Sequence, residues 1–81
     1  MAILIDAPRW RHRDRVWCHV VSDTSLDELH AFARRLGVPG RAFHRDHYDL
    51  PSDLHAHAIE LGARLVRSRD LILALRAAGL R

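Results

Sequence analysis

Apolar residues in the first part of the chain are arranged as two short strands. Residues 2–5 form a β-rich run that ends at Asp6, because Pro8 cannot donate a hydrogen bond to a strand ladder. Residues 16–21 form a second run, in which His19 shares one face with apolar neighbours. Both faces of this second run are largely apolar, so we expect a central strand that is covered on both sides.

Three other stretches carry apolar residues at spacings of three and four, which is typical of amphipathic helices. The first helix should begin at Ser25, which can form a capping box with Glu28, and should end at Gly37. The other two helices are expected over residues 51–62 and over residues 68–79, the latter with Ser68 as its N-cap.

The segments between these elements have weaker patterns. Residues 9–15 show neither a strand nor a helix period, so we expect a charged loop. Residues 41–50 are either a short strand around residues 43–48 or an ordered loop, and residues 64–67 form a brief strand. Together the elements predict one α/β domain spanning residues 1–81, with three helices and a single-layer mixed or mostly parallel sheet of about four short strands. The first two strands favour an antiparallel pair, since their connection is short for a crossover.

The composition is that of a globular protein. Hydrophobic residues make up 48% of the 81 residues and charged residues 28%, which argues against disorder and repeat architectures. No apolar run approaches the roughly 20 residues of a membrane span, and the amino end lacks a signal-peptide layout. We therefore expect a cytoplasmic protein without a membrane partner. The one cysteine, Cys18, suits a buried hydrophobe better than a nucleophile.

All thirteen basic residues are arginines, and the formal net charge is +3 with neutral histidine. The densest basic patch is RWRHRDR, residues 9–15, whose guanidinium groups could bind phosphate while an indole stacks on a base. A solvated loop and a GC-rich coding genome explain the same arginines equally well. The candidate contacts to nucleic acid or phosphate are Arg9, Arg11, Arg13, Arg15 and Trp10, with Trp17 nearby.

The densest group of chemically active side chains is HRDHYD, residues 44–49. It contains two imidazoles, two carboxylates and a phenol, all of which can bind a metal ion or relay a proton. In an extended strand, side chains alternate between the two faces. One face then carries Arg45, His47 and Asp49, and the opposite face carries His44, Asp46 and Tyr48. Each face then carries a carboxylate beside an imidazole.

Polar residues of the second strand and the first helix could converge with this window. His19 lies on the strand, Asp23 follows its carboxyl end and His30 lies on the helix, and such positions are neighbours in α/β folds. Zinc or manganese would suit imidazole and carboxylate ligands, although the spacings match no standard ligand signature. The alternative is a set of structural side chains, namely a hydrogen-bonded core histidine and a turn built by aspartates.

Two sequence blocks are specific enough to indicate a family. They are SDTSLDELHAFARRLG, residues 22–37, and DHYD, residues 46–49. With His19, they resemble a small bacterial and phage domain family of unknown function, of about this length, over most of the chain from Ile5 to Ala63. The resemblance implies a complete domain with a shared polar set, but no activity. That set is Asp6, His19, Asp23, His30, His47, Tyr48 and Asp49.

The leading interpretation is one shallow site, metal-dependent or not, that binds or hydrolyses a phosphate-bearing ligand such as a nucleotide or nucleic acid. Its catalytic candidates are the seven residues of the polar set. Other kinds of site are not indicated, because the sequence contains neither a G-x-S-x-G nucleophile elbow nor a glycine-rich phosphate loop. The alternatives are a non-catalytic module that binds nucleic acid or protein, and an accessory domain that works as a homodimer. The candidate ligands for a divalent metal such as zinc or manganese are His19, His30, His47 and Asp49.

Overall fold

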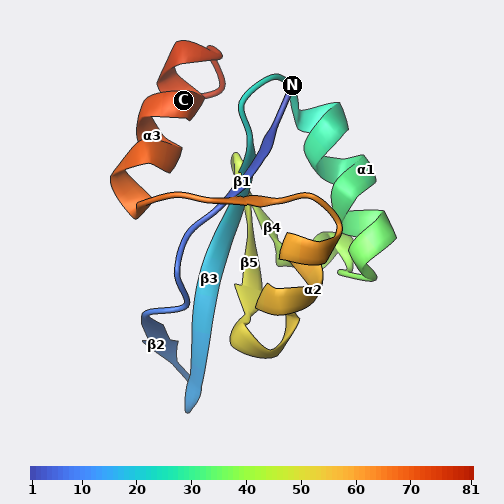
Figure 1. Cartoon of the computed structure of the whole chain (residues 1–81), viewed down its shortest axis with the longest axis vertical. Coiled ribbons are helices and arrows are strands. Elements are labelled where there is room, and N and C mark those ends of the chain that lie inside the picture. Colours follow the sequence, from blue (N-terminus) through green and yellow to red (C-terminus); the bar gives the residue numbers. More distant parts are fainter.

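The computed structural model describes all 81 residues and shows one mixed sheet with helices on both faces (Figure 1). The helices are α1 (Leu26–Leu36), α2 (His55–Glu60) and α3 (Ser68–Ala77), with 3₁₀ turns η1 (Gly40–Ala42) and η2 (Ser52–Leu54). The strands are β1 (Ile3–Ile5), β2 (Trp10–His12), β3 (Arg15–Ser22), β4 (Phe43–His44), β5 (His47–Pro51) and β6 (Arg64–Leu65). The strand order is β4-β5-β3-β1-β6, and β2 pairs with the beginning of β3. The predicted α/β class with three helices is confirmed.

The sheet has six strands rather than about four, and most of its pairs are antiparallel. Only β1 and β6 run parallel, while the other four pairs are antiparallel. The expected mixed sheet is therefore confirmed, and its alternative, a mostly parallel sheet, is wrong. The physical reason is the length of the connections, because tight turns such as the one between β2 and β3 allow only antiparallel pairing. The antiparallel pairing of the first two predicted strands, now β1 and β3, is confirmed.

The segment expected as a charged loop is instead a hairpin. Arg13 and Asp14 join β2 to β3 with φ angles of 53° and 60°, so both residues of the turn have left-handed conformations. The pairing places Trp10 directly opposite Trp17. Two-residue turns of this kind usually carry Asn-Gly or Asp-Gly, and the Arg-Asp pair therefore conceals the hairpin in the sequence.

A second hairpin replaces the single strand expected around residues 43–48. The chain turns at Arg45, with φ of 62°, and at Asp46, so that β4 and β5 pair with His44 opposite His47. His44 and His47 therefore lie on one face with Asp49. The sequence period correctly groups His47 with Asp49 but places His44 on the wrong face, because it takes no account of the turn.

Local capping confirms the bounds of the first helix. Ser25 Oγ accepts a hydrogen bond from the Glu28 N–H at 3.1 Å, and Gly37 ends α1 with φ of 82°. The Glu28 carboxylate accepts a hydrogen bond from the Ser22 hydroxyl, so the capping box is not reciprocal. The second helix begins at His55, later than expected, because η2 takes up the preceding turn.

Helices cover the two faces of the sheet to different extents. α1 and α2 lie on one side (Figure 1), over a core of 13 buried residues that includes Val20 and Leu50. On the other side, α3 packs Leu71 and Leu75 against Val21 in a core of only four buried residues. The strip of β3 and β5 beyond α3 is less covered, and it carries the site described below.

None of the three helices combines the length and apolarity that crossing a bilayer requires.

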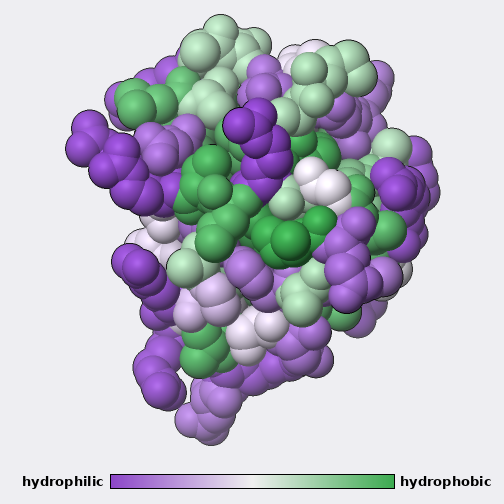
Figure 2. All heavy atoms as spheres, in the orientation of Figure 1, coloured by the Kyte–Doolittle hydropathy of each residue, from purple (hydrophilic) through white to green (hydrophobic).

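Figure 2 shows hydrophobic side chains gathered around the middle of this face of the molecule. The lower end, where the β2–β3 hairpin lies in Figure 1, is mainly hydrophilic. Trp10 on this hairpin is nevertheless 52% exposed, so part of a large aromatic side chain faces solvent there.

Candidate functional site

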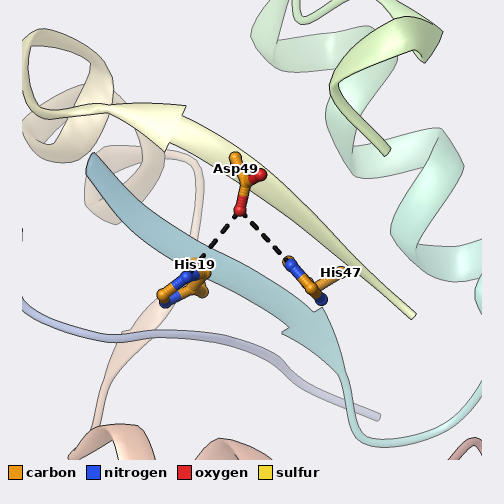
Figure 3. A group of neighbouring side chains, drawn as sticks. All are labelled: His19, His47 and Asp49. Atoms are coloured by element: carbon orange, nitrogen blue, oxygen red, sulfur yellow. Dashed lines mark ion pairs between the residues drawn. The ribbon is translucent and has the colours of Figure 1, made fainter. Parts of the chain in front are cut away.

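Two histidines and an aspartate converge on the less covered face of the sheet (Figure 3). His19 on β3 lies directly opposite Asp49 on β5, and His47 precedes Asp49 by two residues on the same face. Asp49 Oδ1 is 3.3 Å from His47 Nε2 and 3.7 Å from His19 Nε2. One ligand atom from each residue lies within 4.8 Å of the other two. We call these three residues the His/Asp cluster.

A buried carboxylate lies behind each imidazole of the cluster. His19 Nδ1 is 3.0 Å from Asp6 Oδ2, and His47 Nδ1 is 2.9 Å from Asp46 Oδ1. The two carboxylate side chains are 0% and 6% exposed. A carboxylate on Nδ1 favours the tautomer with its proton on that atom and leaves a lone pair on Nε2. Both Nε2 atoms then face Asp49 as potential metal ligands.

Donors from distant parts of the chain hold these carboxylates in place. Asp6 accepts hydrogen bonds from the His19 N–H at 2.7 Å and from the Ser68 hydroxyl at 2.6 Å. Asp46 accepts two hydrogen bonds from the Arg81 guanidinium, at 2.8 and 3.1 Å. Ser68 is the first residue of α3 rather than the predicted N-cap, and its hydroxyl is used by Asp6. The acids behind the cluster are therefore rigidly positioned.

The same hydrogen bonds set the charges of the site. Burial alone disfavours ionised Asp6, but the hydrogen bonds that it accepts, first from His19, hold its pKa below the ordinary value. Hydrogen bonds from Arg81 and His47 likewise overcome burial and lower the pKa of Asp46. The hydrogen bond to Asp6 raises the pKa of His19 in spite of burial. Two ionised carboxylates therefore lie behind the imidazoles at neutral pH.

A cavity of about 200 Å³ lies between the cluster and α3. Its lining includes both imidazoles of the cluster, the Arg81 side chain and apolar residues such as Trp10 and Ile72. The Trp10 ring packs edge-on against His19, with ring centroids 5.2 Å apart. A small ligand in this cavity would therefore contact the imidazoles on one side and apolar side chains on the other.

The sequence matches the model of a family described as "Protein of unknown function (DUF4031)" over residues 3–78. The chain belongs to this family. Its membership confirms the resemblance to a small domain family of unknown function and extends the match through α3. No curated protein and no solved structure shows a significant match. Because the description of DUF4031 carries no activity, the function has to be inferred from the side chains.

Only part of the predicted polar set of this DUF4031 protein converges. Asp6 joins the His/Asp cluster through His19. His30, expected as a fourth metal ligand, does not, because α1 lies on the other side of the sheet. There its Nδ1 atom is 2.7 Å from the hydroxyl of Tyr48, which is 4% exposed. His30 and Tyr48 therefore form a separate pair that packs with Phe43.

Asp23, also a member of the predicted set, stabilises the sheet away from the cluster. Its carboxylate accepts hydrogen bonds from the backbone N–H of Ala2 and the hydroxyl of Thr24, both at 2.8 Å. The hydrogen bond from Ala2 is the main reason that the pKa of Asp23 lies below its ordinary value. Asp23 thereby links the start of β1 to the end of β3.

Sequence analysis missed three residues of the site, Asp46, Ser68 and Arg81. The position of Asp46 directly before His47 could have indicated a partner for the imidazole, but an aspartate at this position is equally well explained as a turn residue. Ser68 and Arg81 carry no local signal, because they reach Asp6 and Asp46 across 62 and 35 residues of chain.

The arginines of residues 9–15 lie on or beside the hairpin. Arg15 forms an exposed ion pair with Asp53 at 3.3 Å, and its guanidinium is 5.4 Å from the centre of the Trp17 ring. The others are exposed and form no ion pair, namely Arg9, Arg11 and Arg13. Their charges are therefore available to a ligand.

Cys18 lies next to His19 on β3 but points to the opposite face of the sheet. Its side chain is fully buried, and burial raises the pKa of the thiol to about 12. The thiol is therefore protonated at neutral pH, and its buried position on the opposite face keeps it away from the His/Asp cluster.

Proposed function

We propose that this protein binds a divalent transition metal ion, zinc in the first place, through His19, His47 and Asp49, and that the ion binds a phosphate-bearing ligand. The observation that carries the proposal is the pair of buried carboxylates on the Nδ1 atoms of the histidines. Histidines that bind metals commonly donate their second N–H to a carboxylate, which orients the ring and strengthens the ligand. Two such pairs facing one aspartate fit a metal centre better than a structural network.

The distances fit zinc with small side-chain movements. Zinc lies about 2.0 to 2.2 Å from nitrogen and oxygen ligands, so ligand atoms in a tetrahedral site are about 3.4 Å apart. Asp49 Oδ1 is 3.3 and 3.7 Å from the two Nε2 atoms, and no ligand pair is more than 4.8 Å apart. Imidazole and carboxylate groups also bind manganese, so both ions belong in the experiment.

The coordination number favours an additional ligand. Three protein ligands leave a position open, as in catalytic zinc sites, and the Asp49 side chain is 45% exposed. A bound ion of this kind polarises a phosphoryl oxygen and lowers the pKa of bound water, which is the chemistry of phosphoester hydrolysis. The net charge of +3 also favours an anionic ligand.

A metal-free arrangement explains the same contacts in a different way. A protonated His19 would form ion pairs with Asp6 and Asp49, and the raised pKa of His19 agrees with this. The two explanations differ in their response to zinc. Only a metal centre predicts that zinc stabilises the folded protein, because an ion that binds only the folded state shifts the unfolding equilibrium.

Titration of the chelator-treated protein with Zn²⁺, Mn²⁺ and Co²⁺ tests the metal centre. We expect one ion per chain by calorimetry, a higher thermal midpoint, and the visible absorption of low-coordinate Co²⁺. His47→Ala and Asp49→Asn should each lower the affinity by more than about 10-fold. His57→Ala is the control, because this exposed histidine on α2 pairs only with Glu60 of the same helix. Absence of stoichiometric binding, or binding that survives both site variants, overturns the metal centre.

The phosphate ligand is tested on the Co²⁺-loaded protein. Inorganic phosphate should change the Co²⁺ absorption of the unmodified chain and of His57→Ala. A spectrum that does not respond to phosphate overturns this part of the proposal. Release of p-nitrophenol from p-nitrophenyl phosphate by the Zn²⁺-loaded protein, lost in Asp49→Asn, would extend the proposal from binding to hydrolysis.

A further inference from the structure

A second hollow, of about 650 Å³, lies beside the β2–β3 hairpin. Trp17 and residues of the segment between α1 and β4 line it together with several basic side chains. Asp49 lines it as well, so this hollow reaches the His/Asp cluster. We call it the basic groove after its basic residues, which are His12, Arg13, Arg15, Arg41 and His44.

The positive charge of the basic groove is available to an anion. Arg13 and Arg41 are exposed and form no ion pair, and Arg15 pairs only with Asp53, whose side chain is 73% exposed. The one carboxylate in the lining is Asp49, which lies next to two imidazoles. Guanidinium groups bind phosphate oxygens through paired N–H donors. Three of them in one groove suit a ligand with several phosphates.

Aromatic side chains lie on the same side of the sheet as the cluster. Trp10 and Trp17 are directly opposite each other on β2 and β3, and His19 follows Trp17 by two residues. Trp10 is 52% exposed and contacts His19 edge-on, whereas Trp17 packs with Arg15. Trp10 lines the cavity next to α3, and Trp17, directly opposite it, lines the basic groove. An exposed indole adjoining a basic groove is a surface on which an unpaired base can stack.

We propose that the phosphate-bearing ligand is a single strand of nucleic acid, with its backbone along the basic groove and a base stacked on Trp10. Repeated phosphates match the three arginines, and an unpaired base matches the exposed indole. A double helix keeps its bases stacked on one another and offers Trp10 no free base. The inference rests on the proposed function only where it places one phosphodiester beside the His/Asp cluster.

Fluorescence anisotropy with labelled oligonucleotides of about 10 nucleotides measures this binding. Oligothymidine DNA, oligouridine RNA and a duplex of the same length are compared, each in chelator and in Zn²⁺. At least one single strand should bind more tightly than the duplex, and the DNA and RNA arms identify which sugar is preferred. Three phosphate contacts predict that log Kd rises with log salt concentration with a slope of about 2.

Single substitutions separate the contributions to binding. Arg13→Gln and Arg41→Gln should each weaken binding severalfold and reduce the salt slope by about 0.7. Trp10→Ala should weaken binding by about fivefold or more and leave the slope unchanged. Arg64→Gln is the matched control, because it removes the same charge from an exposed position on β6, at the edge of the sheet opposite β4. Circular dichroism and urea unfolding establish that each variant is folded.

The outcomes distinguish this inference from the metal centre. Tighter binding of the duplex, or an equal loss of affinity in Arg64→Gln and the groove variants, overturns the single-strand inference. If the protein binds zinc but does not bind a single strand, the inference about the basic groove is rejected and the metal centre is retained. Strand binding in chelator that depends on Arg13 and Arg41, in a protein that does not bind zinc, supports the basic groove and rejects the metal centre alone.

Discussion

Asp6 and His19 are joined twice, since the Asp6 carboxylate accepts the His19 backbone N–H at 2.7 Å and lies 3.0 Å from the ring Nδ1 atom. One contact fixes where the β3 backbone passes, and the other fixes how the ring is turned. The carboxylate is fully buried, so no bulk water competes for these bonds. The position of His19 Nε2 in the His/Asp cluster therefore depends on an acid that directly follows a different strand, β1.

Replacement of this acid should weaken both the fold and the metal centre. Asp6→Asn removes the negative charge of the carboxylate that accepts hydrogen bonds from His19 and Ser68. We therefore expect the free energy of unfolding to fall by about 2 to 3 kcal/mol. Zinc affinity should fall by about 10- to 100-fold, as for other carboxylates behind metal-bound histidines. Urea unfolding in chelator and calorimetric zinc titration measure the two effects.

Asp70→Asn provides the control for loss of an acid, because Asp70 only caps the start of α3 through Arg67. It should leave zinc affinity unchanged. If Asp6→Asn is destabilised but binds zinc as tightly as the unmodified protein, Asp6 has a structural role alone.

Tyr48→Phe should affect stability but not metal binding. The substitution removes the hydroxyl that lies 2.7 Å from His30 Nδ1, on the face of the sheet opposite the His/Asp cluster. One lost hydrogen bond predicts a decrease of about 0.5 to 1.5 kcal/mol in the free energy of unfolding. Zinc titration of the variant should match that of the unmodified protein. A large loss of zinc affinity would instead connect the His30–Tyr48 pair to the site.

Asp23→Ala should make the free energy of unfolding depend slightly less on pH in the acidic range. The folded-state pKa of Asp23 is lowered, so the ionised carboxylate stabilises the fold. This contribution is fully present above the unfolded-state pKa of about 3.9 and is lost as the pH falls through the folded-state pKa. Because Asp23 is exposed, we expect less than about 1 kcal/mol. Urea unfolding from pH 2 to pH 7 tests this, and a difference that grows toward low pH would contradict it.

Asp14→Gly should stabilise the β2–β3 hairpin. Asp14 has φ of 60°, where a side chain is unfavourable and glycine is not, and glycine is the usual second residue of this turn. We expect the free energy of unfolding to rise by up to about 1 kcal/mol. The same change in a helix, Asp27→Gly in the first turn of α1, should lower it by about the same amount. Destabilisation in Asp14→Gly would show that the Asp14 side chain itself stabilises the turn.

Elements with a clear period or cap were predictable from the sequence. Ser25 and Gly37 bound α1 as expected, because a cap and a left-handed terminator act on neighbouring residues. The two hairpins were not predictable, since Arg13 and Arg45 adopt positive φ in their turns, which is uncommon for arginine, and neither turn contains a glycine. Family membership could be inferred because it depends on residue identity alone.

The sequence by itself determined which side chains were available and that His47 and Asp49 share a face, because side chains alternate along any strand. Only the tertiary structure decided that His19 faces them, since this depends on the register of β3 against β5. It also decided that His30 lies on the other side of the sheet, and that Asp6 and Asp46 stand behind the two imidazoles. These arrangements come from contacts between residues far apart in the chain, which no local pattern specifies.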